Sequence, residues 1–269
     1  MDLLSLFLAP DWDDLVFEEA LDRAAPGDVD AILDLATSDD ADVRLHLAHH
    51  LVHLSRGDAP SPRTVQTAIA LTADPDIRVR DWACFALGTQ WDEIDTAELR
   101  DALAARLDDV GRDARSEALM GLALRRDPRA YERVREALSR PSGVVYTLEM
   151  RAAAALGDPD LHALVLEHQT GWDDDEGALA AEVALRLTDP HGPGDDLYDG
   201  VAELSRRRAR GEPDGDALMS WRLMSTVLDL APHRAGEFLE EVVARLGADA
   251  AAVSEITERS ALAVMAAKD

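Results

Sequence analysis

Apolar residues recur in this chain with a period of about 35 residues, and this repeat constrains the fold more than any other feature. The pairs Val43-Arg44, Val79-Arg80 and Ala114-Arg115 place their arginines 36 and then 35 residues apart. Apolar residues follow four and eight positions after the first residue of each pair: Leu47 and Leu51, Ala83 and Leu87, Ala118 and Leu122. Spacing of this kind forms one stripe of an amphipathic helix.

Asp-Pro pairs divide the later part of the chain at an even interval. They stand at residues 127–128, 158–159 and 189–190, and each predicts the end of one helix and the start of another. Before the first of these breaks, each repeat splits into two helices, which we place at residues 29–36 and 43–54, 63–73 and 78–89, and 97–107 and 114–125. A pair this short cannot bury its own apolar faces, so neighbouring pairs must stack. Aromatic residues make up only 4% of a chain rich in Ala and Leu, which also favours an all-α fold.

The segment from Asp74 to Gly88, Asp-Pro-Asp-Ile-Arg-Val-Arg-Asp-Trp-Ala-Cys-Phe-Ala-Leu-Gly, resembles the inter-helix turn and second helix of the HEAT-repeat family. Residues 95–127 resemble the next repeat. The resemblance covers about residues 28–190 and implies a right-handed α-solenoid of about five HEAT-like helix pairs. It also implies a ladder of turn acids and second-helix arginines, matched here by Asp42/Arg44, Asp76/Arg80 and Asp113/Arg115 and fading toward the C-terminal side. The group it resembles most is bacterial HEAT-repeat proteins with no assigned activity.

The two ends of the chain depart from this repeat. Residues 1–27 are expected to form N-terminal capping helices. Residues 191–269 are expected to form divergent helices, at 197–210, 217–230, 234–246 and 250–266, that cap the same solenoid. The apolar stretch at residues 3–9 has no basic flank and is too short to span a membrane. No membrane contact and a cytoplasmic location are therefore expected.

The net charge narrows the class of partner. The chain has 54 Asp and Glu against 27 Lys and Arg, a formal charge of −27. Such a surface repels phosphate backbones, which disfavours nucleic acid, and it favours a basic protein or simply solubility. The basic run at residues 206–210 is interpreted as a helix end. The acidic run at residues 173–176 is interpreted as a turn before a helix, since it lacks the ligand spacing of a calcium loop.

The second helices carry the candidate partner-binding residues. In the family that the chain resembles, these helices line the concave surface where partners dock. The residues on this stripe are His46, His49, His53, Arg78, Trp82, Phe85, Glu117 and Met120. Trp, Phe, Met and Arg are the types that anchor protein interfaces. The competing interpretation is that Trp82 and Phe85 pack between repeats as core.

The histidines of the first repeat suggest a different chemistry. His46, His49, His50 and His53 fall at helical spacing, which is compatible with zinc binding. No Glu or Cys stands beside them as a catalyst or further ligand, so no metal is assigned. No catalytic residue and no cofactor is predicted, because the chain has no phosphate loop, Cys-x-x-Cys, His-Glu-x-x-His or nucleophile elbow. Cys84 is interpreted as a buried small hydrophobe.

Taken together, the sequence predicts a non-enzymatic protein–protein interaction module of the HEAT-repeat scaffold kind. A more specific version is an acidic inhibitor or immunity-type protein that shields a basic enzyme. The alternative is a lyase-like or metal-dependent enzyme, or a ligand carrier, that uses the groove near His46–His53. A third class, nucleic-acid processing, would require Arg78, Arg112, Arg115, Arg125 and Arg126 to gather on one surface. The sequence leaves the oligomeric state open.

Overall fold

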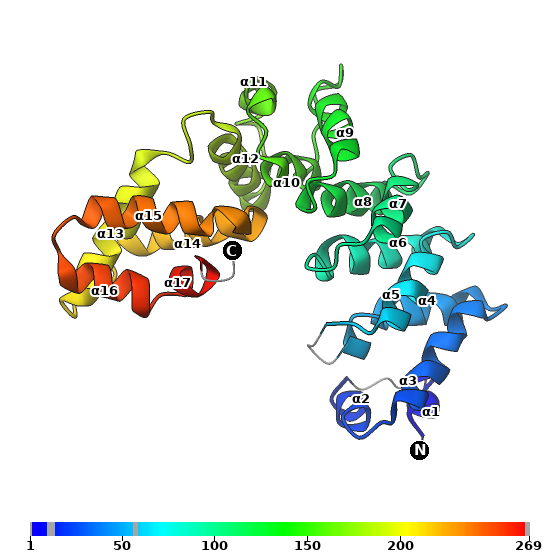
Figure 1. Ribbon diagram of the computed structural model, residues 1–269. Coiled ribbons are helices and arrows are strands. Elements are labelled where there is room, and N and C mark those ends of the chain that lie inside the picture. The colour runs from blue at the N-terminus through cyan, green and yellow to red at the C-terminus, as the bar shows by residue number, and fades with distance from the viewer. Residues whose placement is uncertain (1, 10–13, 56–58, 267–269) are drawn as a thin grey trace. The chain divides into compact units, whose positions relative to one another are not determined.

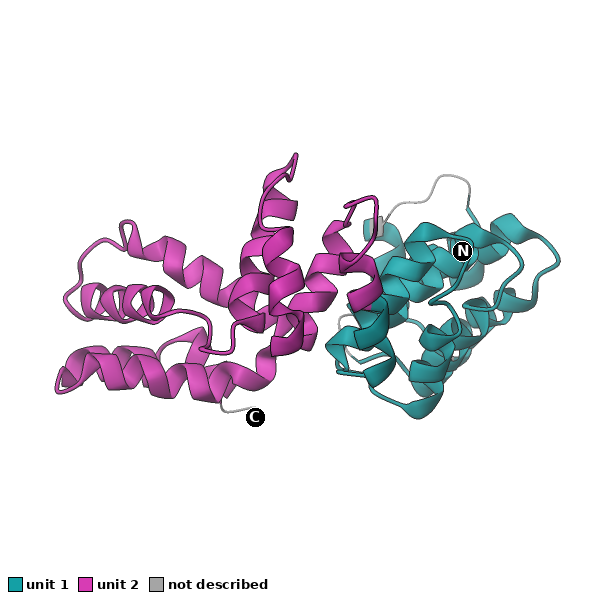
Figure 2. Ribbon diagram, turned by 90° about the horizontal axis from the view of Figure 1, so that it is seen from above, with its two compact units in different colours: residues 1–133 teal, residues 134–269 magenta. Residues whose placement is uncertain are grey.

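The computed structural model describes residues 2–9, 14–55 and 59–266, and every regular element in these ranges is a helix. The chain divides into two compact units, residues 1–133 and 134–269 (Figure 2). The division falls inside α9 (Pro128–Leu138), within the region predicted to hold the repeats. The all-α prediction is confirmed for the described residues.

Unit 1 contains the predicted helix pairs (Figure 1). Its helices before α9 are α1 (Leu3–Phe7), α2 (Asp14–Leu21), α3 (Pro26–Leu33), α4 (Ala41–His50), α5 (Pro62–Leu71), α6 (Ile77–Phe85), α7 (Ala97–Ala104) and α8 (Arg112–Leu124). Capping side chains fix several starts: Ser61 and Thr96 accept from the backbone N–H groups three residues on, and Asp76 accepts from that of Arg78. The predicted helix 78–89 has two parts, because α6 continues as a π-helical turn, η3 (Ala86–Gln90).

The helices of unit 1 pack in two rows. The helix α5 packs on α6 and α7 packs on α8, while α6 also contacts both α4 and α8. The predicted apolar stripe faces this core, since Leu47, Val79, Ala83 and Ala118 are fully buried. Val43 is the exception and is partly exposed. The second helices therefore lie side by side, and their shared inner stripe is what the repeat encodes.

Buried arginines connect neighbouring pairs, but their acidic partners differ from those predicted. Arg44 Nε lies 2.7 Å from Asp74 Oδ2, and Arg80 Nε lies 2.8 Å from Asp109 Oδ2. Both pairs are bidentate, and each joins residues about 30 positions apart. Asp76 instead caps its own helix and pairs with Arg78.

The predicted acids Asp42 and Asp113 are likewise outside the ladder. They pair with exposed arginines, Arg78 and Arg112, rather than with Arg44 and Arg115. Arg115 donates to the backbone carbonyl of Asp109. The ladder therefore has two ion-pair rungs, and the predicted fading begins at the third arginine.

Two glycines bring the backbones of α8 and η3 into direct contact. A Cβ on Gly121 would lie 2.5 Å from the Gly88 Cα, and a Cβ on Gly88 would lie 2.6 Å from the Glu117 carbonyl oxygen. No side chain fits at either position without displacing the backbone. This contact sets how closely the third repeat approaches the second.

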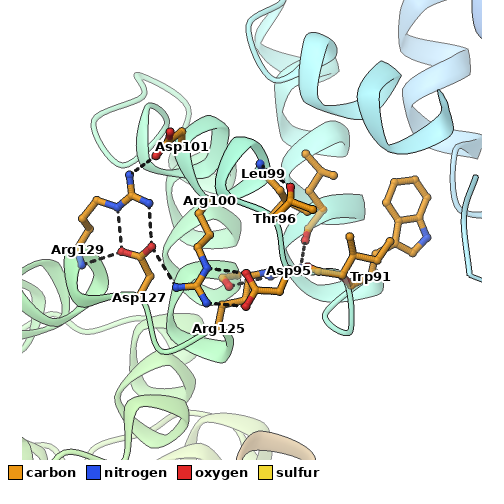
Figure 3. A network of polar contacts seen from close by, with 12 residues as sticks. Trp91, Asp95, Thr96, Leu99, Arg100, Asp101, Arg125, Asp127 and Arg129 are labelled. Carbon is orange, nitrogen blue, oxygen red and sulfur yellow. Dashed lines mark hydrogen bonds and ion pairs between the residues drawn. The ribbon is translucent and has the colours of Figure 1, made fainter. Parts of the chain in front are cut away.

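A buried arginine closes the turn that follows η3 (Figure 3). Arg125, 7% exposed, donates to the carbonyl oxygens of Leu87, Gly88, Trp91, Ile94 and Gly121 over 2.7–3.2 Å. Burial lowers the pKa of its guanidinium. One guanidinium thus donates to carbonyls of η3, of the turn that follows it and of α8.

Beside this cation lies a separate chain of ion pairs. Asp127 accepts from Arg129 at 2.8 Å and lies 3.5 Å from Arg100, which pairs with Asp95 at 2.5 Å (Figure 3). The hydrogen bond from Arg129 lowers the pKa of Asp127 to about 2. Arg129 also reaches Asp101 on α7 at 2.7 Å, so the start of α9 is tied to the third repeat.

Unit 2 begins within α9 and continues with further helices. They are α10 (Thr147–Leu156), α11 (His162–Glu167), α12 (Asp175–Thr188), α13 (Asp195–Ala209), α14 (Ala217–Leu230), α15 (Ala235–Leu246), α16 (Ala250–Glu258) and α17 (Ala261–Ala266). The helix α10 packs on α12 and α14 contacts both, while α13 packs on α14, α15 and α16. The predicted helix 250–266 is wrong in one respect, because it breaks after Glu258 into two helices.

The Asp-Pro breaks end one helix and start the next as predicted at two positions of three. Pro128 opens α9, and Asp158 caps the 3₁₀ turn that leads into α11. Asp189 ends α12, but the following residues form a turn and α13 begins only at Asp195. The basic run does end α13, with Arg207 Nε 3.3 Å from Glu203. No described helix is long and apolar enough to cross a membrane.

Candidate functional site

Three aromatic side chains from adjacent second helices of unit 1 contact one another at the surface. His49 on α4 lies 4.1 Å from Trp82 on α6, measured between ring centroids, and Trp82 meets Phe85 edge-to-face at 5.6 Å. His49 is exposed, and Trp82 and Phe85 are partly exposed. We call these three residues the aromatic cluster. The sequence left open whether Trp82 and Phe85 are core or surface residues. In the structure each ring packs against its neighbours and also keeps part of its area exposed.

Charged residues stand at both ends of the aromatic cluster. At the N-terminal end of α6, Arg78 Nη2 lies 3.0 Å from Asp42 on α4 and 2.7 Å from Asp76. At the other end, the Thr89 hydroxyl lies 3.2 Å from both Glu117 Oε2 and the Phe85 carbonyl. The site therefore has an apolar centre with polar residues on either side, which is the usual layout of an interface.

The structure places the remaining predicted site residues elsewhere. His46 Nε2 donates to the carbonyl of Phe7 at 2.7 Å, and its ring packs 4.6 Å from that of Phe7. His46 thus faces α1. His53 is exposed and its ring lies 5.4 Å from His50. The prediction was wrong for Met120, which is 1% exposed because it lies beside the tight Gly88–Gly121 contact.

The histidines pack on one another instead of converging on a point. His50 lies 4.6 Å from both His46 and His49, measured between ring centroids. Among the described residues, no group of three or more His, Cys, Asp or Glu side chains is arranged to hold a metal ion. Cys84 is fully buried, and burial raises the pKa of its thiol to about 12. It therefore lacks the thiolate that a nucleophile or metal ligand needs.

The arginines named for nucleic-acid processing do not form a basic surface. Arg78 and Arg112 pair with acids, Arg115 donates to a backbone carbonyl and Arg125 is buried among five carbonyls. Arg126 is exposed. The other four are engaged within the protein rather than gathered into a patch for a phosphate backbone.

Sequence reasoning missed two cavities in unit 2. One, of about 410 Å³, is lined by loop residues that include Tyr146 and Trp172. The other, of about 470 Å³, lies between α12 and α14 and includes the exposed Leu179 and Met219. Loop residues have no periodicity, so the repeat gave no signal for the first cavity.

Comparison with known proteins yields partial similarity. No family model matches the chain. The chain is 32% identical over 113 residues to protein YibA of Escherichia coli strain K12, and equally to YibA of E. coli O157:H7. The match covers 42% of this chain, which spans 39% of the length of these curated relatives. The X-ray structure of E. coli YibA aligns with 68% of this chain and 79% of that one, at 22% identity and a TM-score of 0.41.

Proposed function

We propose that this chain is a non-enzymatic protein–protein interaction module, built as a right-handed α-solenoid of HEAT-like helix pairs. The packing of α5 on α6 and α7 on α8, with α6 against α4 and α8, supports this architecture in unit 1. The two ladder rungs support it as well, since each connects equivalent positions of neighbouring pairs.

The observation that carries the proposed function is the partial exposure of the aromatic cluster. Large rings that contact each other on adjacent helices bury much area at little entropic cost when a partner covers them. Flanking carboxylates, such as Asp42 and Glu117, provide polar contacts at the rim. The aromatic cluster with these residues is the docking surface that we assign.

Charge supports a basic partner. Residues 1–133 contain 28 acidic and 14 basic residues, and residues 134–269 contain 26 and 13. Ion pairs and carbonyl bonds engage many of the arginines within each unit, as Arg80 and Arg125 illustrate in unit 1 and Arg186 and Arg245 in unit 2. The acidic excess is left for the surface, where it accelerates encounter with a positive protein. An inhibitor or immunity-type protein that shields a basic enzyme fits this electrostatic description.

The test is site-specific photo-crosslinking in the source organism. A photoreactive phenylalanine derivative at Phe85 should crosslink one partner, whereas the same residue at the exposed Val110 of unit 1 should not. His49→Ala, an exposed change that spares the core, should reduce the yield. The association rate of the purified pair should fall steeply with salt.

Several outcomes would count against the proposal. A crosslinked protein that is equally abundant from Val110 would remove the aromatic cluster as the docking surface. Salt-independent association would remove the basic partner. Stoichiometric zinc in the purified chain, lost in a His49→Ala variant, would favour the metal-dependent alternative instead.

A further inference from the structure

A cavity of about 410 Å³ opens in unit 2, where the loop before α10 meets the loop before α12. Val144 and Tyr146 come from the first loop, and Trp172, Asp173 and Asp174 come from the second. Val144 is 49% exposed and Tyr146 is 41% exposed. None of these residues belongs to the aromatic cluster, so the cavity is a separate feature.

The Trp172 ring in the wall of the cavity is fixed in position. The Trp172 indole Nε1 donates to the His168 carbonyl at 2.9 Å. Its ring covers the first turn of α12 so closely that a Cβ on Gly177 would lie 2.1 Å from the Trp172 Cε3. A ring held this way loses little entropy on binding.

One of these rings already carries a cation. The Arg140 guanidinium carbon lies 5.6 Å from the centroid of the Tyr146 ring, within the range of a cation–π contact. Arg140 is held there by Glu149, whose Oε2 lies 2.8 Å from its Nη1. The Tyr146 ring in the wall of the cavity therefore already binds one guanidinium, and a cation–π contact is the chemistry that an incoming planar cation would use.

Among the described residues, neither Asp173 nor Asp174 forms an ion pair with an arginine. The nearby Arg140 and Arg151 pair with Glu149 and Glu176, whereas Asp173 forms no ion pair with any residue that the structure describes. Asp174 accepts from the Gly177 backbone N–H at 2.7 Å and caps α12. The positive end of the α12 dipole opposes a cation, but Asp174, Asp175 and Glu176 stand in or beside its first turn and offset it.

We propose that this cavity binds an arginine side chain of a peptide segment, with the guanidinium against the exposed Tyr146 ring and the partly exposed Trp172 ring and paired with Asp173. An anion would meet carboxylates, and a neutral apolar group would strip water from them without compensation. Arginine fits better than lysine because its flat guanidinium stacks on rings and also donates two parallel hydrogen bonds to a carboxylate. The inference does not rest on the proposed docking surface of unit 1, because it concerns other residues.

The test is a titration of the full chain followed by NMR. The Trp172 indole N–H signal is identified by its absence in Trp172→Phe, and N-acetylarginine amide is then added. A saturable shift of this signal is expected, with a Kd of about a millimolar, because one cation–π contact and one ion pair provide only a few kcal/mol. N-acetylcitrulline amide has nearly the same shape without the charge and should bind at least about tenfold more weakly.

Matched variants locate the site. Asp173→Asn should weaken binding of N-acetylarginine amide about three- to tenfold. Asp175→Asn removes the same charge two residues on, from an exposed position that does not line the cavity, and should change it less than about twofold. Tyr146→Ala, at an exposed ring, should weaken it about fivefold while the remaining spectrum is unchanged.

Three results would overturn the binding of an arginine side chain in this cavity. They are the absence of saturation with N-acetylarginine amide, equal binding of the citrulline compound, and equal losses for Asp173→Asn and Asp175→Asn. Free arginine, which carries its own carboxylate, is the last arm. Tighter binding of free arginine than of the capped amide would make the ligand a free amino acid and refute the peptide assignment.

Discussion

The rung between Arg80 and Asp109 should hold unit 1 together, and Asp109→Asn tests this directly. Both side chains are buried, with 10% and 2% of their areas exposed. The Asp109 carboxylate accepts from Arg80 Nε and Nη2 at 2.8 Å, from Arg106 at 3.2 Å and from the Gly111 N–H at 2.8 Å. An asparagine keeps the shape but leaves Arg80 without its counter-charge. Breaking a buried pair in this way costs about 3–5 kcal/mol.

The pH dependence of the free energy of unfolding gives a second, independent value for what the Arg80–Asp109 pair contributes. The hydrogen bond from Arg80 lowers the pKa of Asp109 from 3.8 to about 2, and a shift of this size corresponds to about 2 kcal/mol of stability. Because the folded-state pKa is the lower one, this contribution is complete above about pH 4 and is lost as the pH falls toward 2. Asp109→Asn should therefore lower the free energy of unfolding by at least about 2 kcal/mol at pH 7, with the difference from the parent shrinking below pH 4.

The assay is urea unfolding followed by circular dichroism at a series of pH values. Asp113→Asn is the matched control, since Asp113 is 66% exposed and pairs with its neighbour Arg112. It should leave the unfolding midpoint unchanged. The reasoning is refuted if Asp109→Asn costs no more stability than Asp113→Asn. It is also refuted if the stability difference between Asp109→Asn and the parent does not shrink as the pH falls from 4 to 2.

Two further predictions concern the neighbouring backbone contacts. Gly121→Ala should destabilise the protein by about 1–3 kcal/mol through overpacking against Gly88. Gly236→Ala on α15 is the control, since its new Cβ would meet no neighbouring atom within 4 Å. This control should raise the melting temperature, because alanine favours the helix. Arg125→Met should cost several kcal/mol by removing the buried guanidinium that donates to five carbonyls. Arg126→Met at the exposed next residue should be neutral in the same thermal melts, and equal effects of the two changes would contradict the role assigned to Arg125.

Local sequence predicted the helices well and the tertiary partners less well. The helix α14 has the predicted bounds of 217–230, because propensity and apolar spacing act within a few residues. The acids of the ladder were misassigned because Asp74 and Asp76 are equivalent in a local pattern. Only the folded turn shows that Asp76 caps the helix, while Asp74 faces an arginine of the preceding pair.

Local sequence was an even weaker guide to which residues form the docking surface. Alignment of repeats assumes that every second helix presents the same face at the same depth, which would place Met120 where Phe85 stands. Gly88 and Gly121 break this equivalence, because their counterparts in the preceding pair are Val52 and Ala86, which carry side chains. Between η3 and α8 the backbones therefore meet directly, and Met120 is covered. Phe85 stands on α6 before this glycine contact and stays partly exposed, so it, and not Met120, is available to a partner.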